Sequence, residues 1–96
     1  MARMLVESAA DLMDRKGNKV ARKQLAIVKA HVPAMAQQVF DRAIQVHGGA
    51  GVSQDTFLGN AFMGARCLRL ADGPDEVHWR TAARIELSEQ RKPVGF

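Results

Sequence analysis

Cysteine, aromatic residues and long apolar runs are scarce in this 96-residue sequence. The single cysteine, Cys67, excludes an internal disulfide and indicates a reducing compartment, either the cytoplasm or an organelle matrix. Aromatic residues make up 5% of the chain and tyrosine is absent, so any core must be aliphatic and rich in alanine. Glu7 and Asp11 interrupt the apolar residues near the start before a membrane span of about 20 residues could form. These absences predict a soluble chain with no membrane span.

Charge and histidine spacing also exclude some functions. The formal net charge is +4, but the fourteen basic residues are spread along the sequence and mixed with ten acidic ones. Such scattered charge is typical of a solvated helical surface, so we expect no nucleic-acid site, and a polyanion site is the lesser alternative. His31, His47 and His78 lie far apart beside one cysteine. We therefore expect no bound metal.

Apolar residues recur at three- and four-residue steps, which is typical of amphipathic helices. This pattern predicts four helices, over residues 2–16, 19–46 and 57–66 and from Pro74 onward, followed by an irregular polar tail over 88–96. We expect Pro33 to kink the long second helix and Ser53-Gln54-Asp55 to cap the third. The predicted fold is all-α, an antiparallel up-and-down bundle of about four helices in one domain.

The long second helix carries a continuous apolar stripe. Seven residues share this stripe: Leu25, Val28, Val32, Met35, Val39, Ala43 and Val46. At about 1.5 Å per residue the helix would span about 40 Å, which is longer than a small isolated domain needs. We expect the stripe to pack against the other helices.

A glycine-rich segment, Gln45-Val46-His47-Gly48-Gly49-Ala50-Gly51, follows this helix. A Rossmann fingerprint or a P-loop would need a strand before it, so the segment is neither of these. Glycine is a routine helix terminator, and a tight turn between helices is the simpler interpretation. Closely spaced glycines also let backbone amides approach a phosphate, which is the functional alternative.

The segment Asp72-Gly73-Pro74-Asp75-Glu76 places three carboxylates at a helix start. Acids are stabilised there by the helix dipole, so capping is the simpler interpretation. The alternative is that Asp72 projects into a cleft as a general base, while Asp75 and Glu76 stay in the first helical turn. Outside this segment we interpret Trp79 and Cys67 as packing residues.

The two segments together resemble the C-terminal helical domain of the flavin-dependent acyl-CoA dehydrogenases. The resemblance rests on Ala43 to Val52 (AIQVHGGAGV) and Leu70 to His78 (LADGPDEVH), in that order, with Ala65-Arg66 between them. It extends back through Arg3-Met4-Leu5-Val6 to most of the chain. Members of this family oxidise the bond between the alpha and beta carbons of an acyl-CoA thioester, passing hydride to FAD and electrons to an electron-transfer flavoprotein.

The resemblance implies roles for particular residues. Asp72 aligns with the family's catalytic base, which is a glutamate in most members and an aspartate in relatives with the ADGPDEVH form. Asp72 and Gly73 would contact the substrate, and the Asp72 amide would help to hold the thioester oxygen. Residues of the glycine segment would contact the ADP part of an FAD held mainly by a neighbouring subunit: Gln45, Gly48, Gly49 and Gly51. Pro74 and Glu76 would approach the flavin or its adenosine.

A typical family member is several times longer than this sequence and has two further domains before the C-terminal bundle. The sequence opens at what resembles the second helix of that bundle, so we expect the chain to be inactive alone. Two hypotheses follow. The chain is the C-terminal portion of an FAD-dependent acyl-CoA dehydrogenase that forms dimers or tetramers, or it is a non-catalytic helical assembly module derived from that domain.

Overall fold

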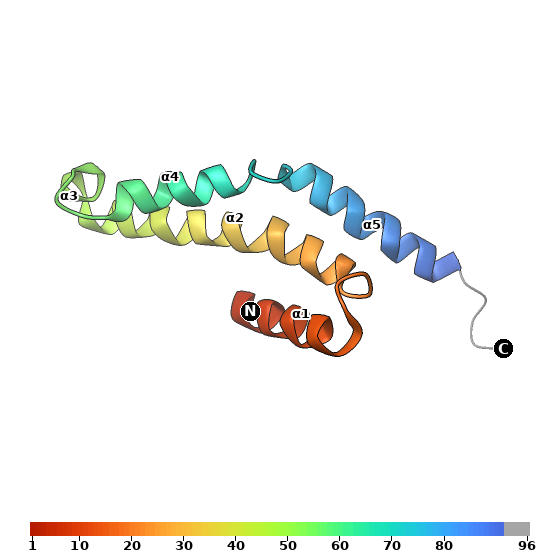
Figure 1. The fold of residues 1–96 in the computed structure, drawn as a ribbon. Helices are drawn as coiled ribbons and strands as arrows, with labels where there is room; N and C mark the ends of the chain where they lie inside the picture. The colour runs from red at the N-terminus through yellow and green to blue at the C-terminus, as the bar shows by residue number, and fades with distance from the viewer. Residues whose placement is uncertain (92–96) are drawn as a thin grey trace.

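The computed structural model describes residues 1–91 of the chain and contains no strand in that range (Figure 1). Four longer helices and one single helical turn follow each other: α1 (Ala2–Lys16), α2 (Arg22–His47), α3 (Gly49–Val52), α4 (Leu58–Leu68) and α5 (Asp75–Arg91). The predicted all-α class and its four helices are confirmed. The added element is α3, because the glycine segment forms a helical turn where we expected a loop.

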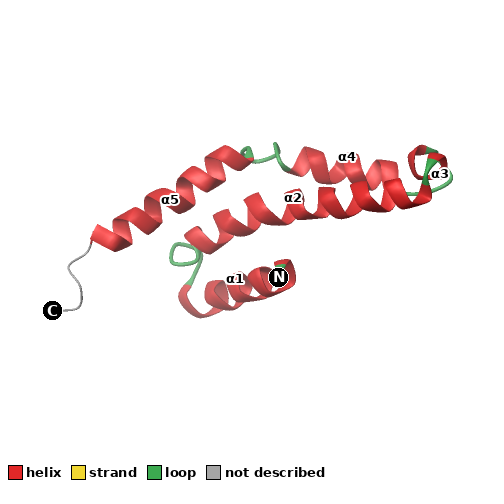
Figure 2. Cartoon of the chain, turned by 180° about the vertical axis from the view of Figure 1, so that it is seen from behind, coloured by secondary structure: helices red, strands yellow, loops and turns green. Residues whose placement is uncertain are grey.

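Helix α2 is the central helix, and each of the other helices packs against it. Helix α1 lies along one side of α2, and α4 and α5 follow one another along the other side, as both views show (Figures 1 and 2). The chain reverses between α1 and α2 and again between α2 and α4, so neighbouring helices are antiparallel. Within residues 1–91, α1 packs on α2 alone, and the molecule measures 61 × 24 × 21 Å. The predicted up-and-down bundle is therefore present, but in an elongated form.

Alanine forms most of the contact surface between the helices. The buried apolar residues are Ala9, Ala21, Ala26, Ala30, Leu58, Ala65 and Ala82. Small side chains let helix backbones approach closely, and each of the four longer helices contributes at least one of these residues. The predicted alanine-rich core is confirmed. This core is thin, because none of the described residues has a large side chain that is fully buried.

Helix α2 continues through Pro33, which is buried, and the kink expected there stays a prediction. Two predictions about helix ends are wrong in detail. Ser53 does not cap α4, because its hydroxyl donates to the Ala50 carbonyl at 2.8 Å and accepts from the Asp55 amide at 3.2 Å. Helix α5 continues to Arg91, so residues 88–91 of the expected irregular tail are helical. The rest of that tail, 92–96, lies outside the described residues.

The apolar stripe of α2 is only partly covered. The buried positions of α2 are Ala26, Ala30 and Pro33, none of which belongs to the stripe, and Val39 and Val46 of the stripe are 53% and 84% exposed. Trp79 is 47% exposed and Cys67 is exposed, so neither is the packing residue that we predicted. No helix within residues 1–91 is long and apolar enough to cross a membrane.

Candidate functional site

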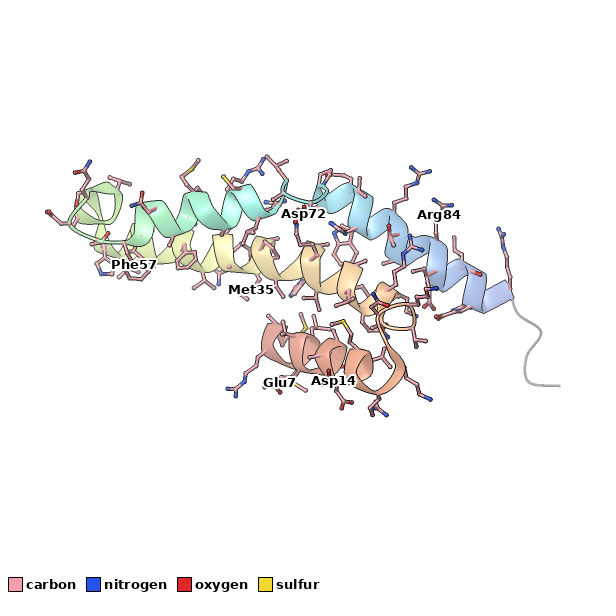
Figure 3. The ribbon with its side chains drawn as sticks, in the orientation of Figure 1. Glu7, Asp14, Met35, Phe57, Asp72 and Arg84 are labelled. Carbon is pink, nitrogen blue, oxygen red and sulfur yellow. The ribbon has the colours of Figure 1, made fainter. Side chains whose placement is uncertain are left out.

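Two exposed turns lie at opposite ends of α4. The glycine turn, residues 45–52, comprises the end of α2, Gly48 and the single turn α3, and it precedes α4. The aspartate turn, residues 70–74, joins α4 to α5. Figure 3 labels Phe57 beside the first turn and Asp72 in the second. Because α4 has 11 residues, the turns are separated by about 16 Å along its axis. The structure therefore does not bring the two predicted groups of site residues together.

The three glycines of the glycine turn differ in whether the fold requires a glycine at their positions. Gly48 ends α2 with a positive φ of 64°, which side chains disfavour. Gly51 is buried, and a Cβ there would lie 2.6 Å from the Ile44 carbonyl oxygen. Gly49 is exposed, has an ordinary φ, and a Cβ there would meet nothing within 4 Å. Packing thus explains Gly48 and Gly51 but leaves Gly49 without a reason inside the chain.

The glycine turn also exposes polar groups. The side chain of Gln45 belongs to the exposed last turn of α2. Within residues 1–91, the amides of Gly49 and Ala50 have no backbone partner, as expected at the start of a helical turn. The glycine turn can therefore offer amide donors to a molecule that approaches closely.

The aspartate turn is held in an unusual backbone conformation. Asp72 has a φ of 55° and is the one non-glycine residue within 1–91 with a positive φ. Gly73 follows with a φ of 109°. The left-handed region costs an ordinary residue about 1–2 kcal/mol, and aspartate and asparagine tolerate it better than most. Asp72 is exposed, and among the described residues its amide has no backbone partner.

An ion pair closes the base of the aspartate turn. Arg69 Nε donates to Asp75 Oδ2 at 2.7 Å, and Arg69 Nη1 donates to Gln37 Oε1 on α2 at 2.8 Å. Asp75 is buried, and its Oδ1 atom has no hydrogen-bond partner in the described residues. The Lys29 ammonium also donates to the Leu68 carbonyl at the end of α4. The turn is thus fixed on both flanks and tied to α2.

His78 supports the aspartate turn from the next helix. Its Nε2 atom lies 3.2 Å from the Asp72 carbonyl oxygen. A Cβ on Gly73 would lie 3.0 Å from the same Nε2 atom, which is tighter than most Cβ contacts and would push the His78 ring away by a few tenths of an ångström. Gly73 is therefore favoured by close approach as well as by its φ.

The structure sorts the predicted residues into two groups. Asp72, Gly73, Pro74 and Glu76 lie together in or next to the aspartate turn, with Glu76 exposed in the first turn of α5. Asp75 also lies in that first turn, as predicted, but it is buried in an ion pair. Sequence reasoning missed three supporting residues, Arg69, Gln37 and His78. Only the position of Arg69 and Asp75, three residues on either side of Asp72, gives a sequence signal.

Within residues 1–91, the protein is an all-helical domain that presents a carboxylate and amides without backbone partners at two separate surfaces. A family model described as "Acyl-CoA dehydrogenase, C-terminal domain" matches residues 1–87. Probable acyl-CoA dehydrogenase FadE2 of Mycobacterium tuberculosis is 53% identical over 90 residues, which are 94% of this chain and 22% of FadE2. Probable acyl-CoA dehydrogenase IBR3 of Arabidopsis thaliana is 54% identical over 94% of this chain and 11% of its own length.

A solved structure agrees with these sequences. A chain from Mycobacterium abscessus, assigned to the acyl-CoA dehydrogenases, superimposes with a TM-score of 0.91 and 52% identity, over 93% of this chain and 22% of that one. The chain belongs to the acyl-CoA dehydrogenase family, as its C-terminal domain. It spans about a fifth or less of the length of these relatives.

Proposed function

We propose that the chain serves as the C-terminal part of an FAD-dependent acyl-CoA dehydrogenase and that Asp72 is the base for alpha,beta-dehydrogenation. The observation that carries this proposal is the left-handed backbone of Asp72, at an exposed turn that packing does not require to be occupied by aspartate. Strained residues persist where the surroundings hold them, and they cluster at functional sites. The strained residue is the one that the family resemblance identifies as the base.

The aspartate turn offers two groups to a thioester. The Asp72 carboxylate would accept the proton from the alpha carbon, and the free Asp72 amide would donate to the thioester oxygen and stabilise developing negative charge. Gly73 lets the substrate approach the backbone. FAD, when bound, supplies the hydride acceptor. Because aspartate tolerates the left-handed region better than glutamate does, this turn favours the shorter base.

The glycine turn fits a cofactor phosphate. Gly49 is open to close approach, the amides of Gly49 and Ala50 are free within the described residues, and Gln45 is exposed beside them. Gly48 and Gly51 would shape this turn by φ and by packing. Since the turn lies a helix length from Asp72, it would bind the ADP part of an FAD held mainly by a neighbouring subunit. Pro74 and Glu76 would approach the flavin side of the site.

The remaining partners follow from this assignment. The reduced flavin would pass its electrons to an electron-transfer flavoprotein, and the enzyme would be a dimer or tetramer in the cytoplasm or an organelle matrix. Large apolar side chains exposed along α5, Val77, Trp79 and Leu87, are available for contacts with other subunits or domains. The chain alone would be inactive, because most groups that hold the flavin and CoA belong to the other domains.

A chimera tests this proposal. The matching 90-residue segment of FadE2 is replaced by this chain, and acyl-CoA oxidation is followed with a dye acceptor, using the acyl-CoA that unchanged FadE2 oxidises best. We expect an active chimera, and we expect Asp72→Asn to lower kcat by about 10²–10⁴-fold with FAD content unchanged, as for loss of a general base. Asp14→Asn, on the exposed face of α1, is the matched control. A folded, FAD-loaded chimera without activity would refute the proposal.

The second candidate is a non-catalytic assembly module, favoured by the exposed stripe residues Val39 and Val46 and by Trp79. Burying such side chains against a second copy would stabilise a dimer by the hydrophobic effect. Sedimentation of the chain decides this point. A strict monomer at micromolar concentration removes the assembly module and leaves the enzyme proposal intact.

A further inference from the structure

The aspartate turn is supported by a histidine to which the proposed chemistry assigns no role. His78 lies one turn into α5 and is half-buried. Its Nε2 atom is 3.2 Å from the Asp72 carbonyl oxygen and 3.0 Å from the point where a Cβ of Gly73 would be. The tip of the ring therefore lies directly against the Asp72–Gly73 segment, where both residues have positive φ.

The hydrogen-bond partner of His78, the Asp72 carbonyl, determines which nitrogen of the imidazole ring carries the proton. A carbonyl oxygen can only accept, so Nε2 must carry the hydrogen and donate it. This bond orients the peptide that follows Asp72. The orientation of the Asp72 side chain depends on the same φ and ψ, so a contact that holds the peptide also aims the carboxylate.

The flanks of the turn are held separately. The Arg69–Asp75 ion pair spans the turn at 2.7 Å, and the Arg69 contact with Gln37 ties it to α2. These contacts bring the ends of the turn together but do not touch Asp72. Within residues 1–91, the contact with His78 is the one hydrogen bond made by Asp72. His78 is therefore placed to stabilise the left-handed backbone conformation of Asp72 over the extended one.

We propose that His78 is a positioning residue for Asp72, holding the base in its left-handed conformation through the Nε2 bond to the Asp72 carbonyl and through contact with Gly73. This inference rests on the proposed function only in calling Asp72 a base. The conformational part concerns this chain alone. The inference predicts that His78→Leu disturbs the left-handed conformation of Asp72, although leucine has a similar volume. His78→Gln should preserve that conformation, because the glutamine amide can donate a hydrogen bond.

The conformational part is tested by NMR on the 96-residue chain. A strong intraresidue NOE between the amide and alpha protons of Asp72 reports its positive φ. We expect this NOE in the unchanged chain and in His78→Gln, and we expect its loss in His78→Leu with helical circular dichroism retained. His47→Leu is the matched control, because His47 also contacts a backbone carbonyl, that of Ala43 at 2.9 Å, far from the turn. Retention of the NOE in a folded His78→Leu chain would overturn the inference.

A second pair of variants covers the case in which His78→Leu does not fold. Gly73→Ala brings a methyl group against the His78 ring. If the ring contacts the turn as described, the fall in melting temperature caused by Gly73→Ala is smaller in a His78→Ala background than in the unchanged chain. Equal falls in both backgrounds would contradict the contact. The residual fall reflects the φ of 109° alone.

The catalytic part is tested in the FadE2 chimera. We expect His78→Leu to lower kcat about 10- to 100-fold with KM nearly unchanged, since small displacements of a reacting group cost this much. His78→Gln should restore most of the rate. If Asp72→Asn abolishes activity and His78→Leu leaves kcat unchanged, the positioning inference fails and the proposed function stands. If Asp72→Asn itself has no effect, the proposed function fails, whatever the NMR shows.

Discussion

The glycine turn and the aspartate turn differ in what their unusual residues do for the fold. In the glycine turn, Gly48 is explained by its φ of 64° and Gly51 by its approach to Ile44. In the aspartate turn, a non-glycine residue, Asp72, has a positive φ that would cause less strain at a glycine. The fold therefore explains Gly48 and Gly51, whereas the positive φ of Asp72 is not explained by packing within residues 1–91 and supports the role proposed for it.

The largest effect that separates the two turns is expected from Gly51→Ala. The added methyl group would lie 2.6 Å from the Ile44 carbonyl oxygen and 2.8 Å from its Cα, and both are backbone atoms that cannot move aside easily. We expect unfolding to become easier by about 1–3 kcal/mol, as for other overpacked sites. Urea denaturation of the chain measures this change. An unchanged midpoint would show that α3 does not pack on α2 as described.

Gly49→Ala is the companion change and should act on binding instead of stability. A Cβ there meets nothing within the chain, and alanine is favourable in a helical turn, so the urea midpoint should not fall. In the chimera we expect FAD affinity to drop about tenfold, which corresponds to about 1.4 kcal/mol. Fluorescence titration of the apoprotein with FAD gives this number. A normal affinity would reduce the glycine turn to a simple helix connection.

Asp72→Gly tests the strain itself. Glycine removes a left-handed penalty of about 1–2 kcal/mol but adds about 0.5–1 kcal/mol of unfolded-chain entropy. We therefore expect a net gain in stability of between about 0 and 1.5 kcal/mol, measured by urea denaturation of the chain. Asp72→Ala, which keeps a Cβ, is the control and should show no gain. A destabilised glycine variant would mean that the Asp72 side chain has a structural role.

The smallest effect is expected at the far end of α5, where Lys23 contacts Glu86 and Glu89 at 2.7 Å each. Hydrogen bonding to Lys23 lowers the pKa of Glu86 below its ordinary value of 4.5. The same two glutamates raise the pKa of Lys23 above 10.5.

The pH dependence follows from these directions. The Glu86 contribution is complete above pH 4.5 and is lost as the pH falls through the lowered value. The Lys23 contribution is complete below pH 10.5 and is lost as the pH rises through the raised value. Because the side chains of Glu86 and Glu89 are about half exposed, solvent screens the ion pairs, and we expect only a slight fall in melting temperature for Lys23→Met between these limits. Lys23→Met should remove the pH dependence of stability that arises from the contacts of Lys23 with Glu86 and Glu89. It should leave the glycine turn and the aspartate turn unchanged. A turn that shifts in this variant would link the two ends of α5.

Local sequence signals predicted the helices well, because periodicity and terminators act within a few residues. Helix α1 ends at Lys16 before Gly17, as predicted. Burial on α2 was predicted less well, since it depends on where neighbouring helices lie: Ala26 and Ala30 are buried while Val46 of the predicted stripe is exposed.

The candidate site divides in the same way. Asp72 was identifiable from a motif, because the residues of one turn are adjacent in sequence. The contacts of Arg69 with Gln37, 32 residues away, and of His78 with the Asp72 carbonyl arise only in three dimensions. The positive φ of Asp72 was also hidden, because aspartate is common in ordinary turns.

The most direct test of the role proposed for the strained Asp72 is the rate of flavin reduction by acyl-CoA in a single turnover of the FadE2 chimera carrying Asp72→Gly. We predict a rate about 10²–10⁴-fold below that of the unchanged chimera, with equal FAD content and a melting temperature at least as high. An unchanged rate of flavin reduction in this variant would contradict the account.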